Sequence, residues 1–136
     1  MKVFWDTNLF IYLIERHPEF HPKVLGLYHR HRDQGDEIVT STLTLGELIA
    51  QPLRLGRWDL VKSYTELLTS GRGIQLAGFD VEAAGHYGRI RAETTLRQPD
   101  AIQMACALAA GANSFITNDQ RLWGVKVSGL SSICGL

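Results

Sequence analysis

The fold of this chain is indicated most clearly by the segment Lys2-Val3-Phe4-Trp5-Asp6-Thr7-Asn8. In this segment a short apolar run of strand type ends in an acidic residue. We predict a buried strand at residues 2–5 and a buried helix at residues 9–14, where apolar residues are dense. Asp6 therefore marks the point at which a strand gives way to a helix. The rest of the chain repeats this strand–helix unit, from which α/β folds are built.

Short apolar runs and amphipathic segments alternate along the chain, with polar turn signals between them. Strands are predicted at residues 2–5, 37–40, 73–77, 114–117 and 125–128. Helices are predicted at residues 9–14, 23–34, 44–55, 58–70, 81–96 and 100–110. This alternation predicts an α/β fold with a central five-stranded parallel sheet flanked by helices. The helical middle, residues 44–70, exceeds what one crossover needs, and we expect it to form a projecting arm or a partner surface.

Length and composition predict one globular domain spanning residues 1–136. Hydrophobic residues make up 45% and charged residues 21% of the chain, ordinary values for a soluble protein. No apolar run approaches the roughly 18–20 residues of a membrane span, and Asp6 interrupts the N-terminal run too early for a signal peptide, so we expect a cytoplasmic protein. Fourteen basic residues balance fourteen acidic ones. This balance argues against a protein that coats nucleic acid nonspecifically, but not against an enzyme with clustered charges.

Four acidic residues stand where a strand or loop meets a helix or turn: Asp6, Glu47, Asp100 and Asp119. Each alone has a structural explanation, as an N-cap, a helix-dipole contact, a turn or, at residues 44–47, a capping box. Jointly they point to a site, because the carboxyl ends of parallel strands share the sheet edge at which ligands bind. Asp100 joins the others on that edge if the loop before its helix brings the helix start there.

Carboxylates that converge in this way must be protonated, spread apart or neutralised by a cation. Two of them about 4 Å apart repel by roughly 4 kcal/mol at an effective dielectric of 20, against total stabilities of about 5–15 kcal/mol. Oxygen-only ligands select hard divalent cations, so the pattern predicts Mg²⁺ or Mn²⁺. A zinc site is not expected, because no histidine or cysteine falls at these positions. The histidines are His17, His21, His29, His31 and His86, and the cysteines, interpreted as buried thiols, are Cys106 and Cys134.

The order of these motifs resembles that of PIN domains, and among them the VapC-like toxins of prokaryotic toxin–antitoxin pairs. A first strand closing in Asp-Thr-Asn is matched by Asp6-Thr7-Asn8, and a Ser/Thr-rich approach to a helical Glu by residues 41–47. An Asp-Ala-x-x-x-Ala helix is matched by residues 100–105, and a Thr-x-Asp turn by Thr117-Asn118-Asp119. The resemblance covers the whole chain and implies a PIN-like fold.

The resemblance implies metal-coordinating and catalytic roles for the four acids, with Thr117 as a polar neighbour and Asn8 orienting the carboxylate of Asp6. It also implies an Mg²⁺- or Mn²⁺-dependent endoribonuclease, in which a metal-activated water leaves a 5′-phosphate and a 3′-hydroxyl. Whether Glu47 binds the metal or takes a proton stays open. The chain departs from the family pattern at Arg121, where many relatives carry another acid, which puts a second metal in doubt.

The implied partners are an RNA substrate, a cognate antitoxin that covers the acidic edge with a cationic side chain, and a second copy of the chain. Candidate contacts to the RNA backbone are Arg54, Arg57, Arg91 and Arg97, together with Lys62 and Arg89. Solvated helix faces explain most of these bases equally well. Candidates for self-association are Leu48, Leu53, Leu55 and Trp58, which core packing would also explain.

Three other functions are weighed against a ribonuclease. A catalytically inactive PIN-like module that binds RNA or protein is the alternative, although four retained acids argue against it. A phosphatase of the haloacid-dehalogenase type needs a second Asp two residues after the first, where this chain has Asn8. DNA cleavage stays open, because nothing in the sequence reads a 2′-hydroxyl.

Overall fold

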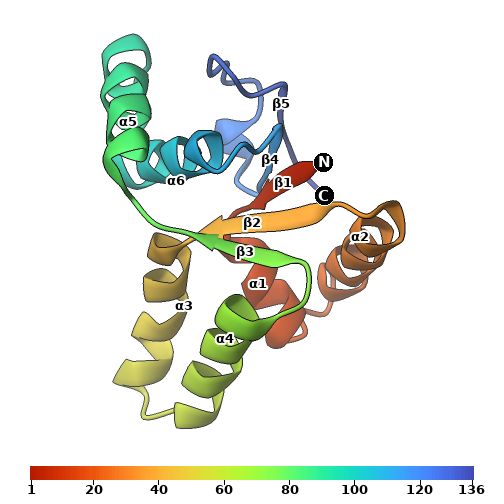
Figure 1. Ribbon diagram of the computed structural model, residues 1–136. Coiled ribbons are helices and arrows are strands. Elements are labelled where there is room, and N and C mark those ends of the chain that lie inside the picture. Colours follow the sequence, from red (N-terminus) through yellow and green to blue (C-terminus); the bar gives the residue numbers. More distant parts are fainter.

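The computed structural model describes residues 1–136 and contains a five-stranded, fully parallel sheet of order β3-β2-β1-β4-β5 (Figure 1). The strands are β1 (Lys2–Trp5), β2 (Glu37–Ser41), β3 (Ile74–Ala77), β4 (Ser114–Ile116) and β5 (Ser132–Cys134). The helices are α1 (Thr7–Ile14), α2 (His21–Gln34), α3 (Thr42–Arg54), α4 (Trp58–Ser70), α5 (Val81–Glu93) and α6 (Gln98–Ala109), with a short 3₁₀ turn η1 (Gln120–Leu122). The predicted fold class is confirmed.

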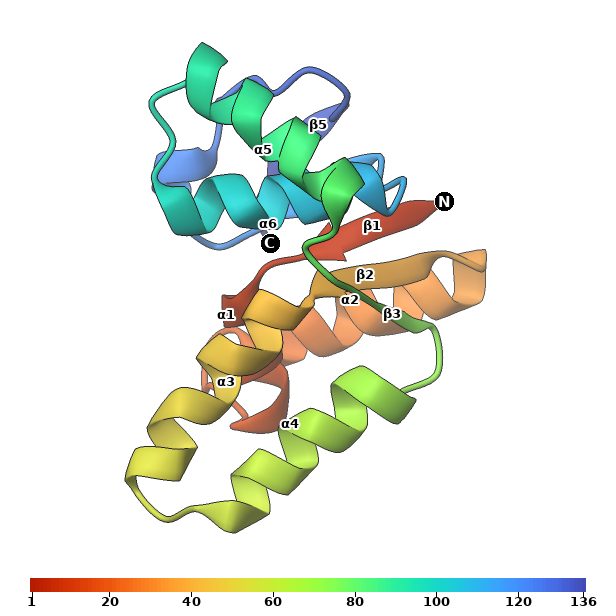
Figure 2. The same cartoon turned by 60° about the vertical axis from the view of Figure 1, so that its left-hand side comes forward.

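Helices cover both faces of the sheet, and the alternation of side chains along β1 shows how. Val3 and Trp5 lie in a core shared with α1 to α4, whereas Phe4 lies in a second core shared with α5 and α6 (Figures 1 and 2). Phe4 stacks on Phe115 of β4 at 4.9 Å between ring centroids. Burying each such side chain contributes about 1.5–3 kcal/mol, so β1 holds the two layers together.

The strand order reverses beside β1, which pairs with β2 on one side and β4 on the other. The chain direction carries β2 and β3 away to one side and β4 and β5 to the other. In open parallel sheets such a reversal leaves a crevice at the carboxyl ends of the central strands. Asp6 follows β1 there, and its backbone N–H donates to the carbonyl of Ile116 at 2.9 Å, which ties the two central strand ends together.

The α3–α4 hairpin projects from the sheet as an antiparallel arm (Figures 1 and 2). Gly56, at φ +66°, makes the turn at its tip. Leu55 and Trp58 beside that turn are 65% and 68% exposed, whereas Leu48, nearer the sheet, is buried in the core. The arm predicted for the helical middle is therefore present, and its apolar surface is concentrated at the tip.

The fifth strand is predicted wrongly. Residues 125–128 form a loop, and β5 lies at Ser132–Cys134 instead. Val127 is buried in the core shared with α5 and α6. The apolar residues of this segment therefore serve the packing of a loop and not of a strand. The chain reaches the sheet edge only after Gly129, at φ +99°, and the hydrogen bond from Ser131 N–H to the Asn113 carbonyl.

The start of α3 also differs from the prediction, by two residues. Ser41 is the N-cap, since its hydroxyl accepts from the backbone N–H of Thr44 at 3.2 Å. Thr44 lies inside the helix, so the predicted capping box at residues 44–47 does not form. Glu47 lies in the second turn and its side chain is released for other contacts.

Two smaller findings concern the cysteines and the helices. Cys106 is buried as expected, whereas Cys134 is exposed because it lies on the edge strand β5. No helix combines the length and the apolar character that crossing a membrane requires.

Candidate active site

All four predicted acids line one pocket of about 400 Å³ at the carboxyl edge of the sheet. Its walls come from the start of α1, from α3, from the start of α6 and from the turn after β4. The lining residues are Asp6, Thr7, Asn8, Ile11, Glu47, Arg97, Pro99, Asp100, Asp119 and Arg121. A hollow of about 430 Å³ lies beside α5, but Glu93 is its only acid, so it offers no comparable chemistry.

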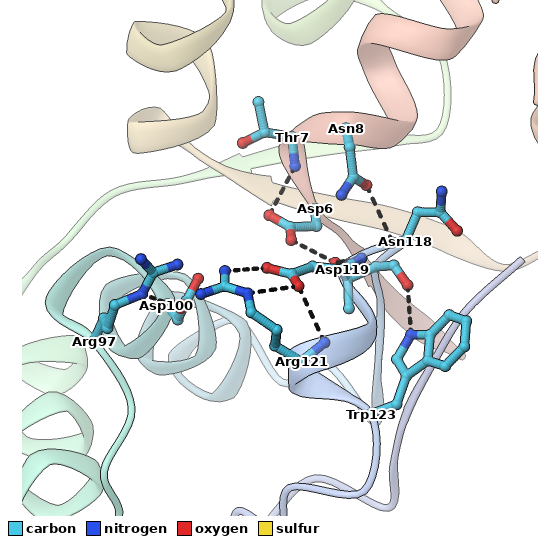
Figure 3. Close-up of polar contacts among 10 residues, drawn as sticks. Asp6, Thr7, Asn8, Arg97, Asp100, Asn118, Asp119, Arg121 and Trp123 are labelled. Carbon is cyan, nitrogen blue, oxygen red and sulfur yellow. Dashed lines mark hydrogen bonds and ion pairs between the residues drawn. The ribbon is translucent and has the colours of Figure 1, made fainter.

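Asp6 is the N-cap of α1, and both of its carboxylate oxygens are held by the protein (Figure 3). Oδ1 accepts from the backbone N–H of Thr7 at 2.8 Å, and Oδ2 accepts from the hydroxyl of Thr117 at 2.7 Å. Burial raises the pKa of Asp6, these two hydrogen bonds oppose the rise, and the negative charges of Glu47 and Asp100 add to it. Asp6 is thus fixed in place while its charge is uncompensated by any cation.

Asp119 lies two residues after Thr117 and is paired with Arg121 (Figure 3). The guanidinium of Arg121 contacts both carboxylate oxygens, with Nε donating to Oδ1 at 3.0 Å. The hydrogen bond from Arg121 holds the pKa of Asp119 below its ordinary value. Thr117 is buried and its hydroxyl also accepts from the backbone N–H of Asp119, so one side chain links the first acid to the last.

Asn8 contacts the turn that carries Asp119. Its side-chain oxygen accepts from the backbone N–H of Asn118 at 3.3 Å (Figure 3). Asn8 is expected from the sequence to orient the carboxylate of Asp6, but it forms no hydrogen bond with it. The two Asp6 oxygens accept from Thr7 and Thr117 instead. Asn8 thus joins the start of α1 to the turn after β4.

Asp100 lies in the first turn of α6, where the helix dipole favours a negative charge. Its side chain is 19% exposed, and the nearest cation is Arg97, with Nε at 3.8 Å from Oδ2 (Figure 3). Pro99 occupies the start of the same helix, a position that suits its missing N–H. The loop after α5 therefore does bring the start of α6 to the edge where Asp6 lies.

Glu47 reaches the pocket from the second turn of α3. Its Oε1 accepts from the hydroxyl of Thr7 at 2.8 Å and from Nε2 of Gln103 at 3.2 Å. Neither Thr7 nor Gln103 is predicted from the sequence as part of the site. The signal for Gln103 is its position as the one polar residue among the apolar residues 101–109 of α6.

The donor set fits a hard divalent cation, because every candidate ligand is a carboxylate. As the side chains stand, no three acids, histidines or cysteines lie close enough together to bind a common metal ion. Two of the acids have a basic partner in the pocket: Asp100 lies within ion-pair distance of Arg97, and Asp119 is paired with Arg121. A cation bound by all four acids would compete with these two arginines for the carboxylates.

The predicted RNA-binding bases are dispersed, and Arg97 alone among them lines the pocket. Arg54 donates to Gln51, and Arg57 pairs with Asp59 at the arm tip. Arg91 lies over the ring of Tyr87 on α5. Arg121, read from the sequence only as a departure from a family pattern, supplies the second guanidinium of the pocket.

Comparisons with known proteins agree with this architecture. The family model described as "PIN domain" matches residues 3–126. A chain of the DNA-bound VapBC complex from Salmonella typhimurium superposes with a TM-score of 0.74 and 24% identity, covering 99% of this chain and 98% of that one. A chain of VapBC2 from Rickettsia felis, bound to a promoter DNA fragment, superposes with a TM-score of 0.73 and 20% identity. The match covers 99% of this chain and 98% of that one. A chain of VapBC-1 from nontypeable Haemophilus influenzae superposes with a TM-score of 0.61 and 21% identity, and the match covers 89% of each chain. No curated protein sequence matches the chain significantly.

Proposed function

Because this chain belongs to the PIN-domain family, we propose that it is an Mg²⁺- or Mn²⁺-dependent endoribonuclease and the toxin of a toxin–antitoxin pair. The observation that carries the proposal is the convergence of Asp6, Glu47, Asp100 and Asp119 from four separate segments on one pocket. Carboxylates gathered in one pocket repel one another, and only Asp100 and Asp119 have an arginine partner, so a bound cation would stabilise the arrangement. Divalent metals are the usual cofactors of PIN nucleases.

In the proposed mechanism, Asp6, Asp100 and Asp119 would hold the metal ion, and Glu47 would either join them or take the proton of the attacking water. A bound divalent ion lowers the pKa of a water ligand and polarises a phosphate oxygen. The backbone N–H of Thr7 and the hydroxyl of Thr117 keep Asp6 oriented throughout. Once Arg97 and Arg121 release their carboxylates, their guanidinium groups are available to bind the phosphates of RNA.

The decisive test replaces Asp100 by Asn and measures Mn²⁺-dependent cleavage of RNA. Loss of one charged ligand is expected to remove several kcal/mol of transition-state stabilisation, a fall in rate of at least about 100-fold. Asp33→Asn on the exposed side of α2 is the matched control and should cleave like the wild type. Sequencing of RNA cut by the wild type but not by Asp100→Asn would identify the target. Undiminished cleavage by Asp100→Asn contradicts the assignment.

The alternative function is a PIN-like module that binds RNA or protein without catalysis. The pairing of Asp119 with Arg121 and of Asp100 with Arg97 favours it, because both acids then have a structural partner. Calorimetric titration separates the two functions. Binding of Mn²⁺ at micromolar to millimolar concentration supports the nuclease, and no binding at millimolar Mg²⁺ or Mn²⁺ supports the module.

The proposed partners are a cognate antitoxin and a second copy of this chain. The superposed structures are complexes described as VapBC, which makes an antitoxin the first protein to test. We propose that it covers the acidic pocket and brings a cationic side chain to it, so that excess antitoxin stops RNA cleavage. For self-association we propose the tip of the α3–α4 arm, where Leu53, Leu55 and Trp58 are exposed.

A further inference from the structure

Gln103 is a polar side chain in the most buried helix of the protein. It is 2% exposed, and its neighbours Met104, Ala105 and Cys106 on α6 belong to the hydrophobic core. A buried amide costs free energy unless its hydrogen-bonding groups are paired. Its contacts therefore indicate what this residue contributes.

The amide of Gln103 is fully paired, and every partner is a polar side chain near the pocket. Its Oε1 accepts from the hydroxyl of Ser41, the N-cap of α3. Its Nε2 donates to the hydroxyl of Thr44 at 2.8 Å and to Oε1 of Glu47 at 3.2 Å. A carboxylate can only accept, so the nitrogen end of the amide must face Glu47.

These contacts join the three helices that carry the pocket. Gln103 lies three residues after Asp100, on the same helix. Its amide crosses to α3, and Nε2 also lies 3.3 Å from the hydroxyl of Thr7, the first residue of α1. The hydroxyl of Thr7 in turn donates a hydrogen bond to Oε1 of Glu47. A movement of α6 relative to α3 would therefore disturb Glu47 directly.

The anchoring of Glu47 is one-sided. Both protein donors, the Thr7 hydroxyl and the Gln103 amide, contact Oε1, and no protein donor contacts Oε2. Glu47 is otherwise an exposed side chain with several rotatable bonds, and holding it still costs entropy. Two donors on one oxygen fix the carboxylate and leave its other oxygen for a ligand in the pocket.

We infer that Gln103 is a positioning residue, which fixes Glu47 through Oε1 so that Oε2 is presented to a cation. This inference rests on the proposed metal-dependent function. Groups that hydrogen-bond to metal ligands orient them, and their loss commonly lowers metal affinity about 10- to 100-fold. Gln103 acts through Glu47, so its effect must vanish when Glu47 can no longer bind a cation.

The test is a double-mutant cycle of Gln103→Met and Glu47→Gln, read by calorimetric titration with Mn²⁺. Gln103→Met should lower the affinity about 10-fold in the wild-type background and by less than about two-fold in the Glu47→Gln background. Gln75→Met on β3 is the matched control, a change of the same kind outside the pocket, and should bind Mn²⁺ like the wild type. Equal losses in both backgrounds, or no loss in either, overturn the inference.

A second cycle needs no metal and separates this inference from the nuclease proposal. In the metal-free protein, urea unfolding of the same four variants should show coupling between Gln103 and Glu47 of at least about two-fold in the unfolding equilibrium constant. If the wild type binds no Mn²⁺, the nuclease proposal fails, and the urea cycle alone decides whether Gln103 holds Glu47. Should Gln103→Met fail to fold, Gln103→Asn takes its place, because it keeps an amide that is too short to reach Glu47.

Discussion

At the scale of single residues, Asp6 is the acid whose charge the fold opposes. Burial raises its pKa, and the nearby Glu47 and Asp100 raise it further against the two hydrogen bonds that lower it. A carboxyl group with a raised pKa in the folded state stabilises the fold only while protonated. That contribution is complete below the ordinary pKa of 3.8 and is lost as the pH rises through the folded-state value.

Asp6→Asn is therefore predicted to make the metal-free protein more stable at pH 7. The expected gain in the free energy of unfolding is of the order of 1 kcal/mol, the scale of a partly screened charge–charge interaction. The gain should shrink as the pH falls toward 3.8, because wild-type Asp6 then becomes neutral as well. Urea unfolding at pH 7 and pH 4 in the presence of a chelator measures both values. The prediction is contradicted if Asp6→Asn is less stable than the wild type at pH 7 and the loss of stability is the same at pH 4.

At the scale of secondary-structure elements, Ser41 has two roles that most N-caps do not combine. It caps α3 by accepting a hydrogen bond from Thr44 N–H, and its hydroxyl donates a hydrogen bond to Oε1 of Gln103 on α6. Asp80 caps α5 in the same way, accepting from Ala83 N–H at 2.9 Å, but it lies outside the pocket. The two helix starts thus offer a comparison between capping alone and capping combined with site support.

Asp80→Ala is predicted to lower the free energy of unfolding by about 1 kcal/mol, the usual effect of losing an N-cap side chain. Ser41→Ala should lower it by more, because the buried Oε1 of Gln103 also loses its hydrogen-bond partner. Only Ser41→Ala should also weaken Mn²⁺ binding, because the amide of Gln103 then loses the partner that fixes its orientation. Urea unfolding and calorimetry on the two variants check both statements. Equal Mn²⁺ affinity in the two variants would show that Ser41 serves its helix alone.

The sequence predicts elements well where one physical signal dominates. Gly56 separates α3 from α4 as predicted, and the apolar run before Asp6 forms β1. Prediction fails where two structures share a pattern. The apolar residues 125–128 suit an edge strand and a buried loop equally, and only the tertiary position of Val127 decides between them.

The same distinction applies to the candidate site. Acids at strand ends could be placed on one edge by topology alone, and the structure brings all four to one pocket. The position of Asp100 depends on how the loop after α5 packs, which no local pattern encodes. The contacts of Asn8 and Gln103 arise between segments that are distant in sequence, so they become visible only in the folded chain.

At the scale of the whole molecule, the arm tip is an exposed apolar surface, and we propose that a second copy of the chain covers it. We predict that the wild type is a dimer in solution and that Leu55→Ser combined with Trp58→Ser weakens the dimer at least about 10-fold, since both side chains are largely exposed in the single chain. Sedimentation equilibrium measures the change. Val81→Ser, at an even more exposed apolar residue on α5, is the control and should leave the mass unchanged. A monomeric wild type contradicts the prediction.

The central position of β1 has a consequence for the order of events on the ribosome. Asp6 is synthesised well before its hydroxyl partner Thr117, which comes 111 residues later. Folding during synthesis proceeds as segments emerge, so the pocket can close only after Thr117 has left the ribosomal tunnel. If the protein cleaves RNA as proposed, a chain cut short before Thr117 lacks part of the pocket and is not expected to cleave RNA.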